Sequence, residues 1–286
     1  MKVIELKDRA ECFQCIQFLK KEGSLNLYLY EGITQGRVFY WNFCLQCNGR
    51  TIGVIHTKNG EYIHIFLLKN IEKHTINDIK HFLYCKFPKL SAIFSEKDNL
   101  DNFLKAAEIG IGKKRDYFYM EMEKDDFFPV YQNKGIETRP EMASLLLPLQ
   151  IQYEVEELGI KRSEISRLKV RAVLKKRLER KEITALFHGN KPIAMAGVNA
   201  RFEDTCQIGL VYVVPGWRGK GVGLLIISSH VERLFKRYEK IVLFVDKKNE
   251  KAFRLYKNAG FHTAGELEQV HIYRHCCSAA QPRGNS

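Results

Sequence analysis

The chain has 286 residues, of which 45% are hydrophobic and 28% charged, so it can bury a core and is long enough for two domains. No apolar run approaches the length of a membrane-spanning helix, and the N-terminal segment MKVIELKDRAECF carries charges where a signal peptide would be apolar. We therefore expect a cytoplasmic protein with no membrane partner.

The net charge favours an anionic ligand or partner without identifying it. Lys and Arg number 46 against 33 Asp and Glu, which gives a formal charge of +13. The densest stretch, residues 161–182, holds ten cations and three anions among apolar residues at helical spacing. We interpret it as a solvated helix face.

Two cysteine pairs have the spacing of a four-thiolate zinc site. Cys12 and Cys15 lie in a helical pattern, however, whereas Cys44 and Cys47 end a strand-like run, so we expect no metal. The other cysteines are expected to be reduced thiols. Cys276 and Cys277 fall in a polar segment, 276–286, that we predict to be a flexible tail.

Several elements are predicted in residues 1–128. The aromatic-rich stretches LYLYEG (27–32) and RVFYWNF (37–43) alternate as buried strands do. A helix is expected over residues 76–87, and a strand, a capped helix and a glycine follow in 92–110. Mixed charge, Pro129 and Gly135 place a domain boundary within 125–134, so we expect domains at 1–128 and 129–275.

The second domain is predicted to begin with helices and continue with a sheet. The first helix is expected to be interrupted near Pro148, because proline removes a backbone donor, and a second spans about 163–180. Strands at 182–188, 193–200 and 206–214 should form an antiparallel meander.

A helix, the buried strand 240–246, and a further helix are expected after this meander. Asn249 should cap the last helix and Gly260 should close it. A final strand is predicted at 269–274. Because a strand–helix–strand connection is right-handed and parallel, strands 208–214 and 241–245 should pair in parallel.

The two halves resemble each other at a constant offset of 150 residues. Residues 92–110 match 242–260 at five positions, including Asn99 with Asn249 and Phe103 with Phe253. We interpret this as a diverged duplication whose first copy is a scaffold, because the segment FLLKNIEKHTI has no glycine and Ala106 matches Tyr256.

The stretch VYVVPGWRGKGVG leaves a strand and enters a helix through three glycines, at 219, 221 and 223. Glycines permit left-handed backbone angles, so successive N–H groups can form an anion-binding concavity at the helix N-terminus. Arg218 and Lys220 add charge. A diphosphate is therefore the expected ligand. The spacing fits neither a P-loop nor a dinucleotide fingerprint, so neither ATP nor NAD is favoured.

These residues resemble the GNAT superfamily of acetyl-CoA-dependent N-acetyltransferases over about residues 135–274. RGKGVG fits the (Q/R)xxGx(G/A) motif, and NEKAFRLYKNAGF resembles the second signature. The resemblance implies an α/β (α+β) fold of tandem GNAT-like domains, each a mixed, mostly antiparallel sheet with a central parallel pair flanked by helices. The N-terminal domain would be a degenerate copy without the phosphate loop.

The resemblance also implies a binding site for acetyl-CoA as cosubstrate. The loop would hold the diphosphate, and the pantetheine arm would pair with strand backbone left open where the parallel strands splay. The implied binding residues are Val211, Tyr212, Val213, Arg218, Gly219, Lys220, Gly221, Val222, Gly223, Leu224, Asn249, Ala252, Phe253 and Tyr256.

Direct attack of an amine on the thioester is the implied reaction. The Val213 backbone N–H would polarise the carbonyl, and Tyr256 would protonate the leaving thiolate. The general base stays open between Glu203 or Asp204 and the first-helix carboxylates of Glu154, Glu156 and Glu157.

We therefore expect an acyltransferase that moves an acetyl group to a primary amine on a small molecule or peptide. A non-catalytic CoA-binding or sensor module is the first alternative. A basic nucleic-acid-associated protein is the second, with residues 161–182 as its binding helix; we do not expect a nucleic-acid partner.

Overall fold

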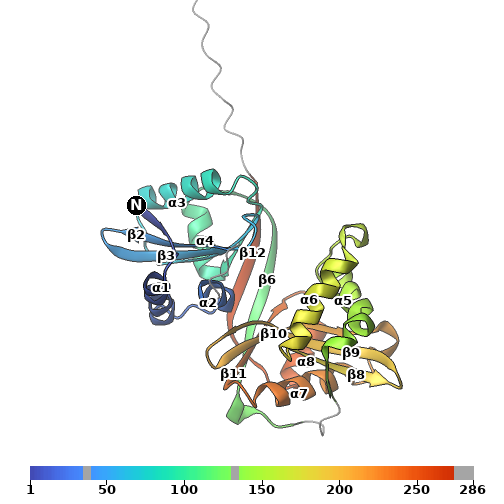
Figure 1. Cartoon of the computed structure of the whole chain (residues 1–286). Coiled ribbons are helices and arrows are strands. Elements are labelled where there is room, and N and C mark those ends of the chain that lie inside the picture. The colour runs from blue at the N-terminus through green and yellow to red at the C-terminus, as the bar shows by residue number, and fades with distance from the viewer. Residues whose placement is uncertain (35–39, 130–134, 274–286) are drawn as a thin grey trace, which may run out of the picture. The chain divides into compact units, whose positions relative to one another are not determined.

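The computed structural model describes residues 1–34, 40–129 and 135–273. Contacts divide the described residues into two compact units, one within residues 1–116 together with 267–273, and one within residues 117–266. The long strands β6 (Gly110–Glu123) and β12 (His262–Tyr273) each contribute residues to both units (Figure 1). The domain boundary at residue 128 stays a prediction, and the contact-based division lies elsewhere because these two strands are shared.

In the first unit the strands follow the order β1-β2-β3-β4-β5-β12. Neighbours are antiparallel except β4 and β5, which are parallel. The strands are β1 (Lys2–Glu5), β2 (Trp41–Cys47), β3 (Arg50–Thr57), β4 (Tyr62–Leu67) and β5 (Ala92–Glu96). The helices are α1 (Arg9–Lys21), α2 (Leu27–Thr34), α3 (Lys73–Lys86) and α4 (Lys97–Ala106).

The segment LYLYEG is the start of helix α2, and the prediction of a strand there was wrong. Its alternation over six residues fits a period of two, but Leu27, Tyr30 and Ile33 recur every three residues and all are buried. Helical spacing therefore places these side chains on one buried face. Its expected placement in the core is confirmed.

In the second unit the strand order is β6-β11-β10-β9-β8-β7. The predicted antiparallel meander and the parallel pair β10–β11 are both confirmed. The strands are β7 (Ile136–Glu137), β8 (Ile183–His188), β9 (Lys191–Phe202), β10 (Thr205–Val213) and β11 (Lys240–Asp246). The helices are α5 (Ala143–Glu156), α6 (Arg167–Glu179), α7 (Val222–Leu234) and α8 (Glu250–Asn258).

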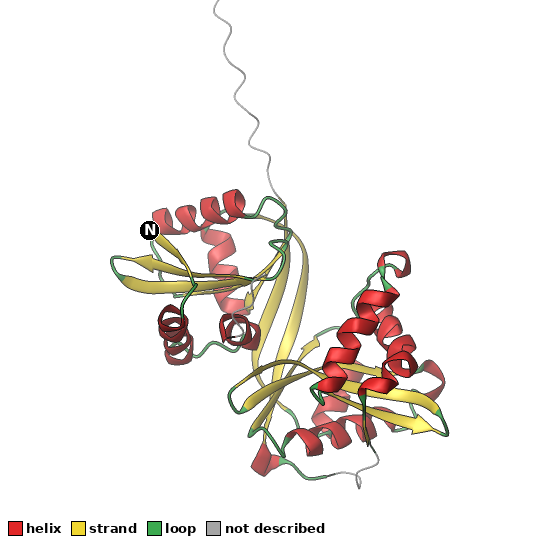
Figure 2. Cartoon of the chain, viewed as in Figure 1, coloured by secondary structure: helices red, strands yellow, loops and turns green. Residues whose placement is uncertain are grey.

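Helices lie on both faces of the strands in each unit (Figure 2). In the second unit, α5 and α6 pack with Met195, Leu210 and Tyr212 on one face, whereas α7 and α8 pack with Ala194 and Ala196 on the other. This alternation along β9 is the two-residue period of a strand buried on both faces. Each face thus has a helical layer of its own.

Helix α5 runs through Pro148 without a break, so the predicted interruption was wrong. Pro148 is exposed, whereas Leu146, Leu147 and Leu149 around it are buried against α6 and the sheet. Proline removes one backbone hydrogen bond. Apolar burial on both sides of that position holds the helix together despite the loss.

The predicted duplication agrees with the topology. In the first unit β4, α3, β5 and α4 follow one another, with β4 parallel to β5. In the second unit β10, α7, β11 and α8 repeat that order, with β10 parallel to β11. Both units therefore carry the same strand–helix–strand–helix core.

Candidate functional site

The parallel ladder between β10 and β11 ends before either strand does. Its last pair is Ile208 with Leu243, whereas β10 continues to Val213 and β11 to Asp246. A bulge lies at this point, because the register with β9 shifts between Gly209 and Tyr212 and Leu210 has a left-handed φ of 51°. The end of β10 is thus turned away from its parallel neighbour.

The amide direction near the end of β10 follows from one hydrogen bond. The N–H of Val214 donates to the carbonyl of Ile193 on β9 at 2.9 Å. Because successive residues of an extended strand point their amides to opposite edges, the N–H of Val213 points to the edge away from β9. This is the edge on which the parallel ladder has ended.

The glycine loop has the predicted left-handed conformations. Gly219 has a φ of 73°, and Gly221 has a φ of 78° and caps the N-terminus of α7. The first amides of a helix have no intrahelical acceptor, so those of α7 are free to bind an anion. Gly223 has a different function: a Cβ there would lie 3.3 Å from Leu255, so its lack of a side chain lets α7 approach α8.

Arg218 connects the loop to β10 and to α5. Its Nε donates to the Val213 carbonyl at 2.8 Å, and its Nη2 donates to Oε2 of Glu156 at 2.6 Å. The Lys220 ammonium lies 5.5 Å from the centre of the Trp217 ring. Both loop cations are exposed and stand at the end of β10.

Glu156 is the centre of a small polar network. Its Oε1 accepts a hydrogen bond from the Tyr212 hydroxyl at 2.8 Å, while Oε2 pairs with Arg218. The hydrogen bond from Arg218 lowers the pKa of the Glu156 carboxyl. Burial and the neighbouring Glu156 carboxylate raise the pKa of Tyr212 to about 12. At neutral pH the network therefore contains a carboxylate, a guanidinium and a neutral phenol.

Three of the predicted residues lie in helix α8 or at its N-cap. Asn249 accepts a hydrogen bond from the Ala252 N–H at 3.1 Å, which confirms it as the N-cap. The Phe253 ring packs on Phe118 with centroids 4.7 Å apart. Tyr256 is 9% exposed, and burial raises its pKa, with smaller contributions from Tyr153 and Glu157.

The predicted carboxylates lie in different places. Glu203 and Asp204 form the turn before β10, at the opposite end of that strand from Val213. Nine residues of strand correspond to roughly 25–30 Å, so neither can act as a base at Val213. Glu156 and Glu157 lie at the end of α5 by Tyr212 and Tyr256, and Glu154 accepts a hydrogen bond from Gln150 at 3.0 Å.

Sequence reasoning missed Tyr153. Its side chain is partly buried, packs with the core formed by α5, α6 and the sheet, and its phenol acts electrostatically on Tyr256. The sequence signal was weak, because an aromatic residue on an apolar helix is as consistent with packing in the core as with a role at the site. The fold is what brings this side chain to the bulge.

The cysteine motifs are only partly brought together. Cys15 on α1 and Cys44 on β2 are both buried, and each affects the pKa of the other thiol. Within residues 1–34, 40–129 and 135–273, no group of three or more His, Cys, Asp or Glu side chains is arranged to hold a metal ion. Cys276 and Cys277 lie outside the described residues.

Among residues 1–34, 40–129 and 135–273, no helix is long and apolar enough to cross a membrane.

Comparison with known proteins agrees with this geometry. Residues 152–261 match the model of the Acetyltransferase (GNAT) family. A mycothiol acetyltransferase of Corynebacterium aurimucosum is 34% identical over 68 residues, which are 22% of this chain and 22% of that protein. The match therefore spans about a fifth of that relative's length.

Two solved structures are similar over almost the whole chain. A GNAT-family acetyltransferase from Colwellia psychrerythraea has a TM-score of 0.65 at 11% identity, covering 96% of this chain and all of the other, 100%. A tandem GNAT protein from the clavulanic acid biosynthesis pathway has a TM-score of 0.63 at 11% identity, covering 94% and 98%. These likenesses show that the fold is the tandem GNAT fold.

Residues 152–261 are thus similar to the GNAT acetyltransferase family, and this match covers less than half of the chain. The general activity of that family is acetyl transfer, for which acetyl-CoA is the usual cosubstrate.

Proposed function

We propose that the protein is an N-acetyltransferase that transfers the acetyl group of acetyl-CoA to a primary amine on a small molecule or peptide. The amine attacks the thioester directly while both substrates are bound. One observation carries this proposal: β10 continues past its last parallel pair, Ile208 with Leu243, and leads into the glycine loop at the start of α7.

The residues present fit acetyl-CoA as a substrate. The open edge of β10 at Val211 to Val213 offers backbone groups to the amides of the pantetheine arm, as in strand addition. The left-handed Gly219 and Gly221 and the first amides of α7 suit a diphosphate. Lys220 and Arg218 supply positive charge at the same place.

Two groups are proposed to act on the reacting thioester. The N–H of Val213, which points to the open edge, donates to the carbonyl oxygen as negative charge develops there. Tyr256 donates its proton to the departing sulfur. Because burial raises the pKa of Tyr256, its hydroxyl remains protonated at neutral pH.

We place the general base at the end of α5. Glu156 has a lowered pKa because of Arg218, which makes it a weak base while that pair is intact. Glu157 is exposed, and its charge acts on both Tyr153 and Tyr256. Glu157 is therefore the better base for a protonated amine that enters beside α5.

The test is a turnover screen with acetyl-CoA against polyamines, amino acids, aminoglycosides and peptides. Thiol release and the mass of the acetylated product are both measured, and Tyr256→Phe serves as the impaired control. Amine-dependent release with a matching product supports the proposal. Coenzyme A binding without turnover on any amine supports a non-catalytic CoA-binding module instead, and no binding at all contradicts both.

A further inference from the structure

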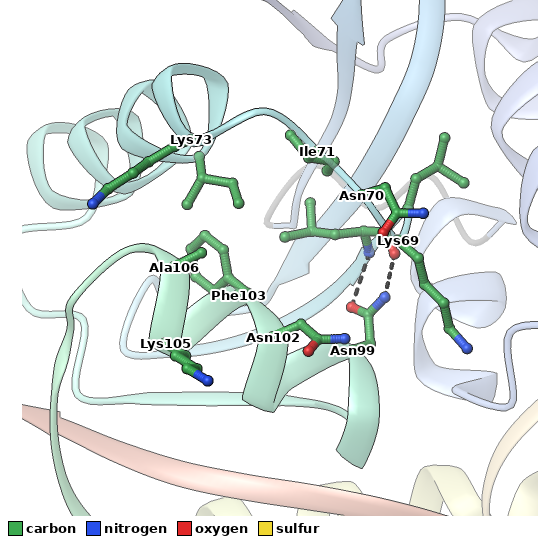
Figure 3. A pocket seen from close by; sticks show the side chains of 12 residues that line it. Lys69, Asn70, Ile71, Lys73, Asn99, Asn102, Phe103, Lys105 and Ala106 are labelled. Atoms are coloured by element: carbon green, nitrogen blue, oxygen red, sulfur yellow. Dashed lines mark hydrogen bonds between the residues drawn. The ribbon is translucent and has the colours of Figure 1, made fainter.

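The first unit contains a cavity that the proposed acetyl transfer does not use. It has a volume of about 470 Å³ and lies between the end of β4, the loop that leads to α3, and helix α4 (Figure 3). Small-molecule pockets in proteins generally have volumes of about 300–1,000 Å³. The cavity is thus large enough for a small organic ligand.

The interior of the cavity is apolar. Leu67, Ile76 and Phe103 line it and belong to the buried core of the first unit, where each is at most 7% exposed. Ile71 and Ala106 extend this surface outward, and Figure 3 shows Ile71 above Phe103 and Ala106 across the opening. Such a lining favours a ligand with an apolar body.

The charged residues that line the cavity are all positive. Its lining includes Lys69, Lys73 and Lys105 and no carboxylate. Nζ of Lys73 lies 2.9 Å from Oε1 of Glu108, and Glu108 is not among the lining residues. In the part of the chain that the structure describes, Lys69 and Lys105 are exposed and form no ion pair. An anionic group is therefore the charge complement of this site.

Asn99 prevents the cavity from holding coenzyme A by strand addition. The parallel ladder of β4 and β5 ends at His64 with Phe94, and Leu67 follows beyond it. The Asn99 side chain is 7% exposed and occupies both backbone groups of Leu67: its Oδ1 accepts from the N–H at 3.1 Å, and its Nδ2 donates to the carbonyl (Figure 3).

The matching asparagine of the second unit behaves differently. Asn249 caps its own helix through the Ala252 N–H. The open strand edge that exists in the second unit is therefore closed in the first by a side chain of the same residue type. The first unit also lacks glycines between Leu67 and Ile76, so this segment has no counterpart of the glycine turn at residues 219–223.

We propose that this cavity binds a small organic anion, an apolar body that carries one carboxylate or sulfonate-like group, and that it excludes coenzyme A. The apolar body lies against Phe103 and Ile71, and the anionic group faces Lys69 and Lys105. Asn102, which also lines the cavity and is exposed, offers an amide donor to the same group.

The experiment uses the full-length chain and two probes, octanoate and 8-anilinonaphthalene-1-sulfonate, with coenzyme A and inorganic phosphate as competitors. Calorimetry and fluorescence titration should show saturable binding of both probes with mutual competition. Neither coenzyme A nor phosphate should displace them. Arg218→Ala should leave probe binding unchanged, which separates this site from the acetyl-CoA site.

Matched variants locate the site. Ala106→Trp fills the cavity and Ile71→Glu adds a carboxylate to its lining, so each should abolish saturable binding. Lys69→Ala and Lys105→Ala should each weaken it about two- to fivefold, as expected for exposed charge pairs, whereas the control Lys113→Ala lies outside the lining and should have no effect. Ile71 is in a loop, so its variant remains informative if Ala106→Trp fails to fold.

Three results overturn the proposal: no saturable binding of either probe, binding that none of the lining variants weakens, or displacement of the probes by coenzyme A.

Discussion

Glu156, the last residue of α5, accepts a hydrogen bond from Nη2 of Arg218, the residue that precedes the glycine turn, at 2.6 Å. The two side chains are 33% and 47% exposed, so the pair is partly solvated. The guanidinium that we propose to bind a diphosphate thus already has an anionic partner within the protein. Acetyl-CoA must therefore compete with Glu156 for Arg218.

Glu156→Gln should tighten the binding of coenzyme A. Removing the charge frees Arg218 from its ion pair. Partly exposed ion pairs contribute little free energy, so the affinity for coenzyme A should increase only about two- to fivefold. Titration calorimetry at low and moderate salt measures it. Glu157→Gln is the control and should leave coenzyme A affinity unchanged; weaker binding by Glu156→Gln contradicts the competition.

Arg218→Ala should have the opposite effect and weaken coenzyme A binding about tenfold. Arg218→Lys should restore part of that loss, because a lysine keeps the charge but cannot form the same planar, two-armed contact. The dissociation constant is again the quantity measured. Equal affinity of the alanine variant and the unmodified protein would contradict a role for Arg218 at the diphosphate.

Tyr256→Phe should reduce kcat about hundredfold, the usual scale of a lost general acid. Affinity for acetyl-CoA should be nearly unchanged, since phenylalanine preserves the buried ring on α8. Steady-state rates together with calorimetry separate the two effects. Tyr238→Phe, at another buried tyrosine of the same unit, is the control and should leave kcat unaltered.

Gly221→Ala should destabilise the start of α7. Gly221 has a φ of 78°, a conformation that costs an L-residue about 1 kcal/mol, and it provides the N-cap of the helix. Urea unfolding should show a loss of that size, and coenzyme A affinity should fall with it. Gly216→Ala is the matched control, because a Cβ there meets nothing within 4 Å.

His230 should make the second unit less stable in acid. Its ring is 1% exposed, its Nδ1 hydrogen-bonds Oγ1 of Thr184 at 2.8 Å, and burial together with Arg233 and Arg177 lowers its pKa to about 3. In the unfolded chain a histidine has a pKa of about 6.5. The folded protein is therefore fully stabilised by neutral His230 above about pH 6.5, and it loses this stability as the pH falls toward the pKa of the folded state, because only the unfolded chain then takes up the proton.

Urea unfolding between pH 7 and pH 4 measures this loss, which for one proton is at most about 1.4 kcal/mol per pH unit. His230→Gln should make the dependence on pH shallower. His188→Gln, at an exposed histidine, should not. An unchanged slope in the first variant would assign the acid sensitivity to other groups.

Local signals in the sequence were sufficient for much of the second unit. Glycine spacing at 219 and 221 predicted left-handed turn residues, and Asn249 was recognised as a helix cap, because both features depend on neighbouring backbone alone. The parallel pairing of β10 with β11 followed from the strand–helix–strand order, which is typical of a crossover connection.

Features that depend on tertiary contacts were predicted poorly. The alternation in residues 27–32 favoured a strand, yet burial of one helical face decided the outcome. Pro148 should have broken a helix, but packing of the leucines around it outweighs the lost hydrogen bond. The network of Glu156, Tyr212 and Arg218 joins residues far apart in sequence, so no spacing rule indicates it.

Strand β12 pairs with β5 through residues 267–271, so the sheet of the first unit includes residues that follow the whole second unit in sequence. During synthesis, the ribosome makes most of the first unit before the second unit but supplies this strand only after it. The nascent N-terminal sheet must therefore wait with β5 uncovered on that side while the entire second unit emerges. A chaperone that binds exposed strand edges is therefore expected to bind this protein mainly during that interval.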